Sequence, residues 1–337
     1  MLKNLRLLLL NLFFLPAIAS ADVPDVVTDI SPIYSLAAKV MDGIGEPKLI
    51  VQHGASPHEY MMRPSNAKAL ESADIVFFVG GGLTPWLENP LKNLASQSII
   101  VELMETKNTT RLAYREGANF ASHEGHNHGG HDDDHDSHEG HDDDHDSHKG
   151  HDDDHDSHKG HDDDHEELDP HGWLDPENGK NWLDIMATTL AKIDPENANK
   201  YQQNAAKGKK EIDESISQIE TMLKPVSDMR FIVFHDAYYY FEDRFGLSAT
   251  GSISLGDASD PSPGRLIEIQ DEIKRLTVSC VFSEPQFNPQ TVQNVASGAA
   301  IDTRVIDPLG SALQVNSDLY TKLLEDIGKS IASCHDH

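Results

Sequence analysis

Runs rich in β-branched residues alternate with amphipathic helical patterns in two parts of the chain, and a long helical segment separates these parts. In the first part the expected strands are 26–30, 48–51, 74–79 and 98–103, and the expected helices are 33–41, 64–71 and 85–94. Strands that alternate with helices form parallel sheets with helices packed on their faces. The apolar run Ile75 to Val79 is typical of a strand buried on both faces. We therefore expect an α/β lobe here.

The same alternation returns after residue 229. The expected strands are 231–234, 278–282 and 303–306, and the expected helices are 236–244, 264–275, 289–299 and about 317–333. A length of 337 residues is typical of about two domains. We predict an α/β fold with two lobes, 22–190 and 226–337, each a doubly wound parallel-sheet domain.

The segment 191–225 between the lobes has the pattern of one long helix. Asp194 fits the N-cap, Pro195 fits the first helical position, and Pro225 ends the pattern. Apolar residues recur at three- and four-residue steps and their multiples, namely Tyr201, Ala205, Ile212, Ile216, Ile219 and Leu223. A helix of about 30 residues spans about 45 Å, more than the width of a small domain. We expect a rigid linker, and not a coiled coil, because e/g charge order is lacking.

The N-terminus predicts export. Lys3 and Arg6 precede an apolar run, and the small residues Ala19-Ser20-Ala21 follow it, so residues 1–21 are expected to be a cleavable signal peptide. A retained membrane anchor is the alternative, but the run is shorter than the roughly 20 residues that a spanning helix needs. We expect a periplasmic protein that is not inserted in the membrane after cleavage.

Charge is concentrated in one insert. The chain has 57 acids and 27 bases, a formal net charge of −30, and residues 122–167 carry −17 of it together with 14 of the 20 histidines. The other residues carry −13. Without a surplus of Lys and Arg, nucleic acid and anionic lipid are excluded as partners.

The insert is built from a decamer, His-Asp-Asp-Asp-His-Asp-Ser-His-[Glu/Lys]-Gly, which begins at 131, 141 and 151 and in truncated form at 161. Because the decamer lacks apolar residues, nothing offsets the entropy of ordering it, and we expect disorder in the absence of ligand. The repeat is interpreted as a low-affinity metal reservoir, a sensor of metal sufficiency or a solvated acidic spacer.

Cys280 and Cys334 are the whole cysteine complement. In an exported protein such a pair favours a disulfide, which would tie the last helix to the strand at 278–283. The alternative is a metal site in the tail Cys334-His335-Asp336-His337.

Six histidines lie outside the insert: His53, His58, His171, His235, His335 and His337. His58 follows the strand that ends near residue 51, His171 lies in a Pro-flanked loop, and His235 directly follows the strand 231–234. Ligands of open α/β sheets bind outside the carboxyl ends of the strands, so these three positions are expected to converge on one cleft. Three convergent histidines predict a metal site there.

Several motifs make a resemblance specific. They are Gly54-Ala55-Ser56-Pro57-His58-Glu59-Tyr60, Arg63-Pro64-Ser65, His171-Gly172-Trp173-Leu174-Asp175-Pro176, Phe234-His235-Asp236-Ala237-Tyr238-Tyr239-Tyr240-Phe241, Cys280-Val281-Phe282-Ser283-Glu284-Pro285-Gln286-Phe287 and Asp307-Pro308-Leu309-Gly310. Over nearly the whole mature chain, the sequence resembles the periplasmic zinc-binding subunits of bacterial zinc ABC importers (ZnuA-like). In that family a long helix joins two lobes, and three histidines bind zinc in the interlobe cleft.

The resemblance implies a zinc receptor that delivers Zn²⁺ to a membrane permease. It implies His58, His171 and His235 as ligands and a Cys280–Cys334 disulfide, and three imidazoles favour zinc over the harder manganese. Pro57 stands where some family members have a ligating Glu, so the fourth ligand is left open between water, Asp307, Glu59 and an insert histidine. Gly80-Gly81-Gly82 is not a phosphate-binding motif, so a separate subunit must hydrolyse ATP. We expect a monomer.

Hydrolytic zinc sites also have three protein ligands and one open coordination position. Glu59 or Asp236 would then serve as the general base, but each has a simpler role as a surface acid or a helix-start residue, so we expect no enzyme activity. Trp173 and the tyrosine run 238–240 are expected to line the cleft. Met61 and Met62 fit packing at a helix entrance better than copper binding, and His53 is expected to be a surface or supporting residue.

Overall fold

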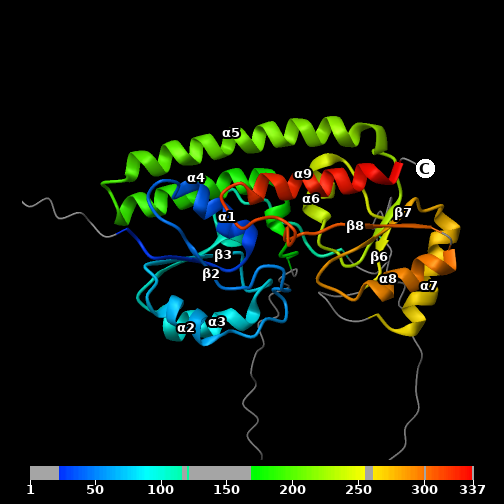
Figure 1. Cartoon of the computed structure of the whole chain (residues 1–337), viewed down its shortest axis with the longest axis horizontal. Coiled ribbons are helices and arrows are strands. Elements are labelled where there is room, and N and C mark those ends of the chain that lie inside the picture. Colours follow the sequence, from blue (N-terminus) through cyan, green and yellow to red (C-terminus); the bar gives the residue numbers. More distant parts are fainter. Residues whose placement is uncertain (1–22, 116–119, 121–167, 255–260, 300, 336–337) are drawn as a thin grey trace, which may run out of the picture.

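The computed structural model describes residues 23–115, 120, 168–254, 261–299 and 301–335 (Figure 1). The expected signal peptide at 1–21 and the insert at 122–167 lie outside these residues. Within the described ranges, every helix is too short or too polar to cross a membrane.

Two four-stranded parallel sheets form the centres of two lobes. The N-terminal sheet has the order β2-β1-β3-β4, with β1 Val26–Thr28, β2 Lys48–Leu49, β3 Ile75–Phe78 and β4 Ile99–Glu102. The C-terminal sheet has the equivalent order β6-β5-β7-β8, with β5 Phe231–Val233, β6 Gly251–Ser252, β7 Cys280–Ser283 and β8 Asp302–Val305. All neighbouring strands are parallel, which confirms the predicted two-lobed α/β fold.

Helices cover both faces of each sheet, as the continuous apolar strands require. In the N-terminal lobe, α1 (Ser31–Val40) packs on the face formed by Val26 and Phe77, and α2 (Pro64–Glu71) and α3 (Glu88–Leu94) cover the face formed by Val27 and Val76. In the C-terminal lobe, α7 (Pro263–Leu276) and α8 (Pro289–Ala299) cover the outer face, and α6 (Tyr239–Phe245) lies on the inner side.

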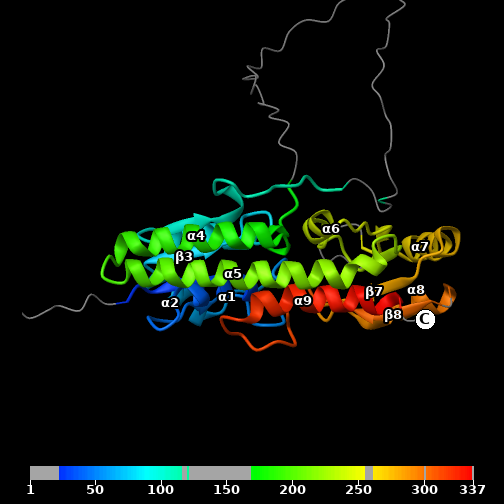
Figure 2. The ribbon, with the colours of Figure 1, turned by 90° about the horizontal axis from the view of Figure 1, so that it is seen from above.

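A layer of long helices joins the lobes. Figures 1 and 2 show α5 (Ala198–Leu223) running along both lobes beside α4 (Pro176–Ile193) and α9 (Leu319–Ala332). The 26 residues of α5 span about 39 Å. Of the predicted apolar stripe, Tyr201, Ala205, Ile212, Ile219 and Leu223 are buried and Ile216 is partly buried. One continuous core cluster contains residues of α5 and of both sheets, so the linker is packed against the lobes along its length.

The start of the linker differs from the prediction. Asp194 is not its N-cap; it ends α4, and α5 begins at Ala198. The Asp194 carboxylate accepts hydrogen bonds from Asn197 Nδ2 (2.8 Å) and Tyr201 Oη (2.7 Å), so it stabilises the turn between two antiparallel helices. Neither α4 nor the two-residue strand β6 was predicted as a separate element.

Cys280 in β7 and Cys334 in the short 3₁₀ helix η5 (Ser333–His335) form a disulfide with a Cα–Cα distance of 5.9 Å. The predicted disulfide is thus present. Because Cys334 is oxidised, the alternative metal site in the tail has no thiolate to use.

Candidate metal centre

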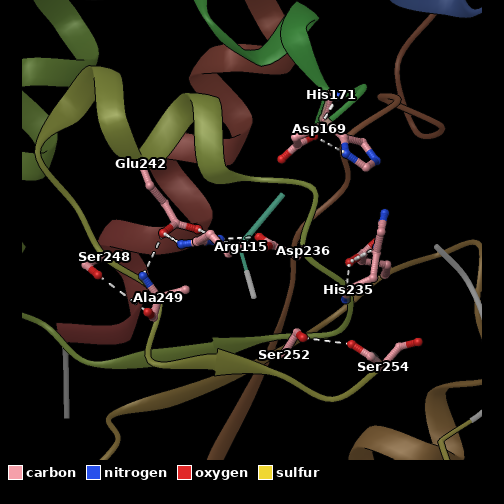
Figure 3. Close-up of polar contacts among 11 residues, drawn as sticks. Arg115, Asp169, His171, His235, Asp236, Glu242, Ser248, Ala249, Ser252 and Ser254 are labelled. Atoms are coloured by element: carbon pink, nitrogen blue, oxygen red, sulfur yellow. Dashed lines mark hydrogen bonds and ion pairs between the residues drawn. The ribbon is translucent and has the colours of Figure 1, made fainter. Parts of the chain in front are cut away.

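His58, His171 and His235 come together between the lobes. One ligand atom from each lies within 4.8 Å of the other two, and the ring centroids are 5.3 to 5.8 Å apart. In Figure 3, the rings of His171 and His235 are directed toward the same space. Zn–N bonds of about 2.0–2.1 Å place the nitrogens of a tetrahedral site roughly 3.4 Å apart, so small ring movements suffice to close on an ion.

His58 lies on the loop after β2. Gly54 has φ +82°, a conformation that favours glycine, and its turn leads the chain toward the cleft. The carbonyl of Pro57 accepts a hydrogen bond from Trp86 Nε1 (2.7 Å), and Trp86 belongs to the 3₁₀ helix η1 (Pro85–Leu87). This indole therefore holds the loop one residue before His58. His58 is half-buried.

His171 directly precedes the 3₁₀ helix η3 (Gly172–Leu174) and is buried with Asp169. Asp169 Oδ1 accepts hydrogen bonds from His171 Nδ1 (2.8 Å) and from its main-chain N–H (2.8 Å). This contact fixes the ring and assigns Nε2 as the nitrogen that could bind a metal. Burial raises the pKa of Asp169, although His171 acts in the opposite direction. At Gly172 a Cβ would lie 2.3 Å from Met104 Sδ, so a larger residue beside His171 would have to displace the Met104 side chain.

His235 follows β5 and is held in the same way by Glu284, which follows β7. Glu284 Oε1 accepts hydrogen bonds from His235 Nδ1 (2.9 Å) and from the main-chain N–H of His235 (3.3 Å). Both residues are almost fully buried. A carboxylate behind the imidazole fixes its tautomer and its orientation.

The cavity between the histidines is small, at about 10 Å³, which is close to the least space that one water molecule needs. Its apolar walls include Trp173, Phe287, Pro308 and Leu309. Trp173 therefore lines the site as expected, and its Nε1 donates to Pro308 O (2.8 Å) across the cleft. The run 238–240 does not line this cavity: Tyr238 and Tyr240 are buried in the core.

Neither carboxylate considered as fourth ligand joins the three histidines in the described part of the chain. Asp307 accepts hydrogen bonds from Gln286 Nε2 (2.9 Å), Leu309 N (3.0 Å) and Ser311, so it organises the loop after β8. Glu59 is exposed. The insert histidines lie outside the described residues.

The remaining sequence candidates have other environments. His53 bonds Ser31 Oγ (2.9 Å) and Leu313 O (2.9 Å), so it links α1 to the loop before α9. Met61 is 89% exposed, contrary to the expected packing, whereas Met62 packs beneath α2 and α3. Asp236 is paired with Arg115.

Asp169 and Glu284 were not singled out from the sequence. A carboxylate two residues before a candidate ligand, in Asp169-Pro170-His171, was the available signal for the first. Glu284 is 49 residues from His235, and only the pairing of β5 with β7 brings them together.

The chain is similar to known proteins over nearly its whole length. A family model described as "Zinc-uptake complex component A periplasmic" matches residues 26–334. A Brucella abortus (strain 2308) relative, "High-affinity zinc uptake system protein ZnuA", is 43% identical over 337 residues, covering 99% of each chain. A relative with the same description from Paracoccus denitrificans (strain Pd 1222) is 44% identical over 317 residues, covering 94% of this chain and 93% of its own.

Solved structures share the fold. A crystal structure of ZnuA superposes with a TM-score of 0.71 at 21% identity, covering 93% of this chain and 99% of that one. A ZnuA deletion mutant (138–173) with zinc bound gives a TM-score of 0.70 at 20% identity, covering 94% and 99%.

Proposed function

The chain belongs to the ZnuA family of periplasmic zinc-uptake components, and on that premise we propose that it captures Zn²⁺ in the periplasm and delivers it to the permease of an ABC importer. The observation that carries the proposal is the cluster of three histidines from loops of the two lobes. Three imidazoles suit zinc, because manganese prefers more oxygen ligands.

The buried carboxylates support a tight site. Asp169 and Glu284 orient His171 and His235 before any ion arrives, so metal binding need not order these two rings. The fourth position is proposed to be taken by water or an insert histidine.

A receptor fits this site better than a zinc hydrolase. The space between the histidines is about 10 Å³, which suits a bound ion better than an organic substrate. Asp236, one of the two formal general bases, is held by Arg115, and Glu59 is exposed. The family itself is one of solute-binding receptors.

Metal titration tests the proposal. We expect calorimetry to show tight zinc binding by the wild type, weaker manganese binding, and a large loss of zinc affinity in each of His58→Ala, His171→Ala and His235→Ala. His53→Ala is the matched control, because His53 lies outside the cluster, and it should retain the affinity. Retained zinc affinity in all three ligand variants would refute the site, and zinc-dependent esterase or phosphatase turnover lost in His235→Ala would favour the hydrolase.

We propose that residues 1–21 direct export and are then cleaved, that the receptor is a monomer, and that the permease and the ATPase are separate subunits. ATP-dependent zinc uptake into vesicles carrying those subunits should require the receptor. Uptake that is unchanged without it would contradict the delivery role.

The insert is proposed to hold further zinc at low affinity. Deleting residues 123–165 should leave one tight site and remove several weaker ones, because the three clustered histidines lie outside the deleted segment. Calorimetry that shows loss of the tight site would place a primary ligand in the insert.

A further inference from the structure

Arg115 lies at the end of a segment that runs from the N-terminal lobe to the C-terminal lobe. We define residues 109–115 together with Phe120 as the interlobe segment. On the N-terminal side, Thr110 N donates to Asn178 Oδ1 (2.7 Å) and Asn178 Nδ2 donates to Thr110 O (3.0 Å), which fixes the segment to α4. On the other side, Phe120 N donates to Thr250 O (3.0 Å), just before β6.

The guanidinium of Arg115 is held by two carboxylates of the C-terminal lobe (Figure 3). Nε and Nη2 donate to Asp236, with an Nε–Oδ2 distance of 2.9 Å, and Nη1 and Nη2 donate to Glu242 at 2.7 and 3.1 Å. The rings of Phe120 and Tyr239 lie 3.8 and 4.5 Å from the guanidinium carbon. The Arg115 side chain is only 13% exposed and Glu242 is 2% exposed, so this is a largely desolvated cluster of strong, oriented hydrogen bonds.

Helix α6 makes two more contacts with segments that lead to His171. Tyr240 Oη donates to Asp169 O (3.0 Å) and accepts from Leu112 N (2.9 Å). Arg244 donates to both carboxylate oxygens of Asp175 at 2.8 and 3.0 Å. The same short helix therefore contacts the chain on both sides of His171.

We propose that Arg115 is a positioning residue for zinc retention, which holds the His235 peptide against α6 through Asp236. This inference rests on the proposed function. Asp236 directly follows His235, so the ion pair fixes the main chain next to a ligand, whereas Glu284 fixes the imidazole itself. A binding constellation must be held within about 0.5 Å of its productive geometry. Arg115 contributes to this from a segment that is anchored to the N-terminal lobe at Thr110.

Arg115→Met should release zinc faster. It keeps an apolar stem between the two rings but leaves Asp236 and Glu242 facing each other without a cation. We expect the zinc dissociation rate, measured by stopped-flow competition with a chelator, to rise about 10-fold. This is the lower end of the change in metal affinity when a residue that hydrogen-bonds a metal ligand is replaced. The association rate should stay unchanged, because the cleft entrance and the ligands are intact. Arg111→Met is the matched control: Arg111 lies in the same segment but pairs with Glu105 at the surface.

A double-variant cycle separates positioning from general stability. If Arg115 acts through Asp236, the rate increases caused by Arg115→Met and Asp236→Asn will not multiply in the double variant. Arg115→Lys keeps the positive charge but loses the planar guanidinium that bonds both carboxylates, and it should raise the zinc dissociation rate less than Arg115→Met does. An Arg115→Met protein with a lower Tm in the metal-free state but an unchanged dissociation rate would overturn the inference, as would multiplicative rates. Absence of tight zinc binding in the wild type would instead refute the proposed function.

Discussion

The carboxylate behind His235 can be altered by one atom. Glu284→Gln keeps an oxygen that accepts from His235 Nδ1 but removes the negative charge that makes the imidazole a stronger ligand. We expect zinc affinity, measured by competition with a chelator, to fall about 10-fold. Glu268→Gln is the control, because Glu268 is exposed on α7 and distant from the cluster. Unchanged zinc affinity in Glu284→Gln would show that the negative charge of Glu284 does not strengthen zinc binding.

Asp29 is a buried carboxylate away from the metal centre. Its oxygens accept hydrogen bonds from Ile30 N and Val79 N, each at 2.8 Å, and tie the end of β1 to the end of β3. Burial raises the pKa of Asp29 to about 7, although these N–H groups lower it. The folded protein thus binds this proton more tightly than the unfolded chain, in which the pKa is about 3.8.

The stability that Asp29 contributes is therefore fully present below about pH 4 and is lost as pH rises toward 7. Its contribution to the free energy of unfolding should fall by about 1.4 kcal/mol per pH unit between these values. Urea unfolding of the metal-free wild type and Asp29→Asn at pH 5 and pH 8 tests this. The variant should be less sensitive to pH, and equal pH dependence in both proteins would contradict it.

At the scale of elements, the disulfide secures the last helix to the C-terminal sheet. It joins residues 54 apart, for which loop-closure entropy predicts a loss of about 4 kcal/mol in the free energy of unfolding when both cysteines are replaced by alanine. Urea unfolding of the Cys280→Ala, Cys334→Ala double variant measures this loss. Wild type unfolded under reducing conditions is the control and should match the variant. Equal stability of the oxidised wild type and the variant would contradict the prediction.

Periodicity predicted the helices and strands whose burial follows from the order of neighbouring residues. The strands of continuous apolar residues and the apolar stripe of α5 are of this kind. Helix α4 was not recognised, because it opens with the turn-like residues Pro176, Asn178 and Gly179. These have partners far along the chain: Asn178 bonds Thr110, and a Cβ at Gly179 would lie 2.3 Å from Tyr320 Oη. Strand β6 has only two residues and no β-branched run.

At the scale of the whole molecule, the sequence predicted that His58, His171 and His235 converge, because the carboxyl ends of parallel strands meet at one edge. It did not predict what holds them. Glu284 and Arg115 reach the His235 segment from positions 49 and 120 residues away in the chain, and such pairings depend on strand order and lobe packing. The convergence of the three histidines could thus be predicted, whereas the network that orients them could not.

The lobes share one core, and this limits how far they can move apart. Residues of both sheets and of α5 belong to a single buried cluster, and Lys39 of α1 pairs with Glu211 of α5 (2.7 Å) and with Asp318 at the start of α9 (2.9 Å). A hinge between the lobes would have to expose part of this core, at about 25 cal/mol for each Å² of apolar surface.

Zinc loading should therefore change the distance between the lobes little. Fluorophores at exposed Lys68 on α2 and Lys274 on α7 report that distance, because these helices lie on the outer faces of different lobes. We expect nearly equal energy transfer in chelator and in saturating zinc, with the adjustment confined to the loops that carry the three histidines. A large zinc-dependent change in transfer, absent from a His235→Ala protein labelled at the same positions, would show that the lobes close on the ion in spite of the shared core.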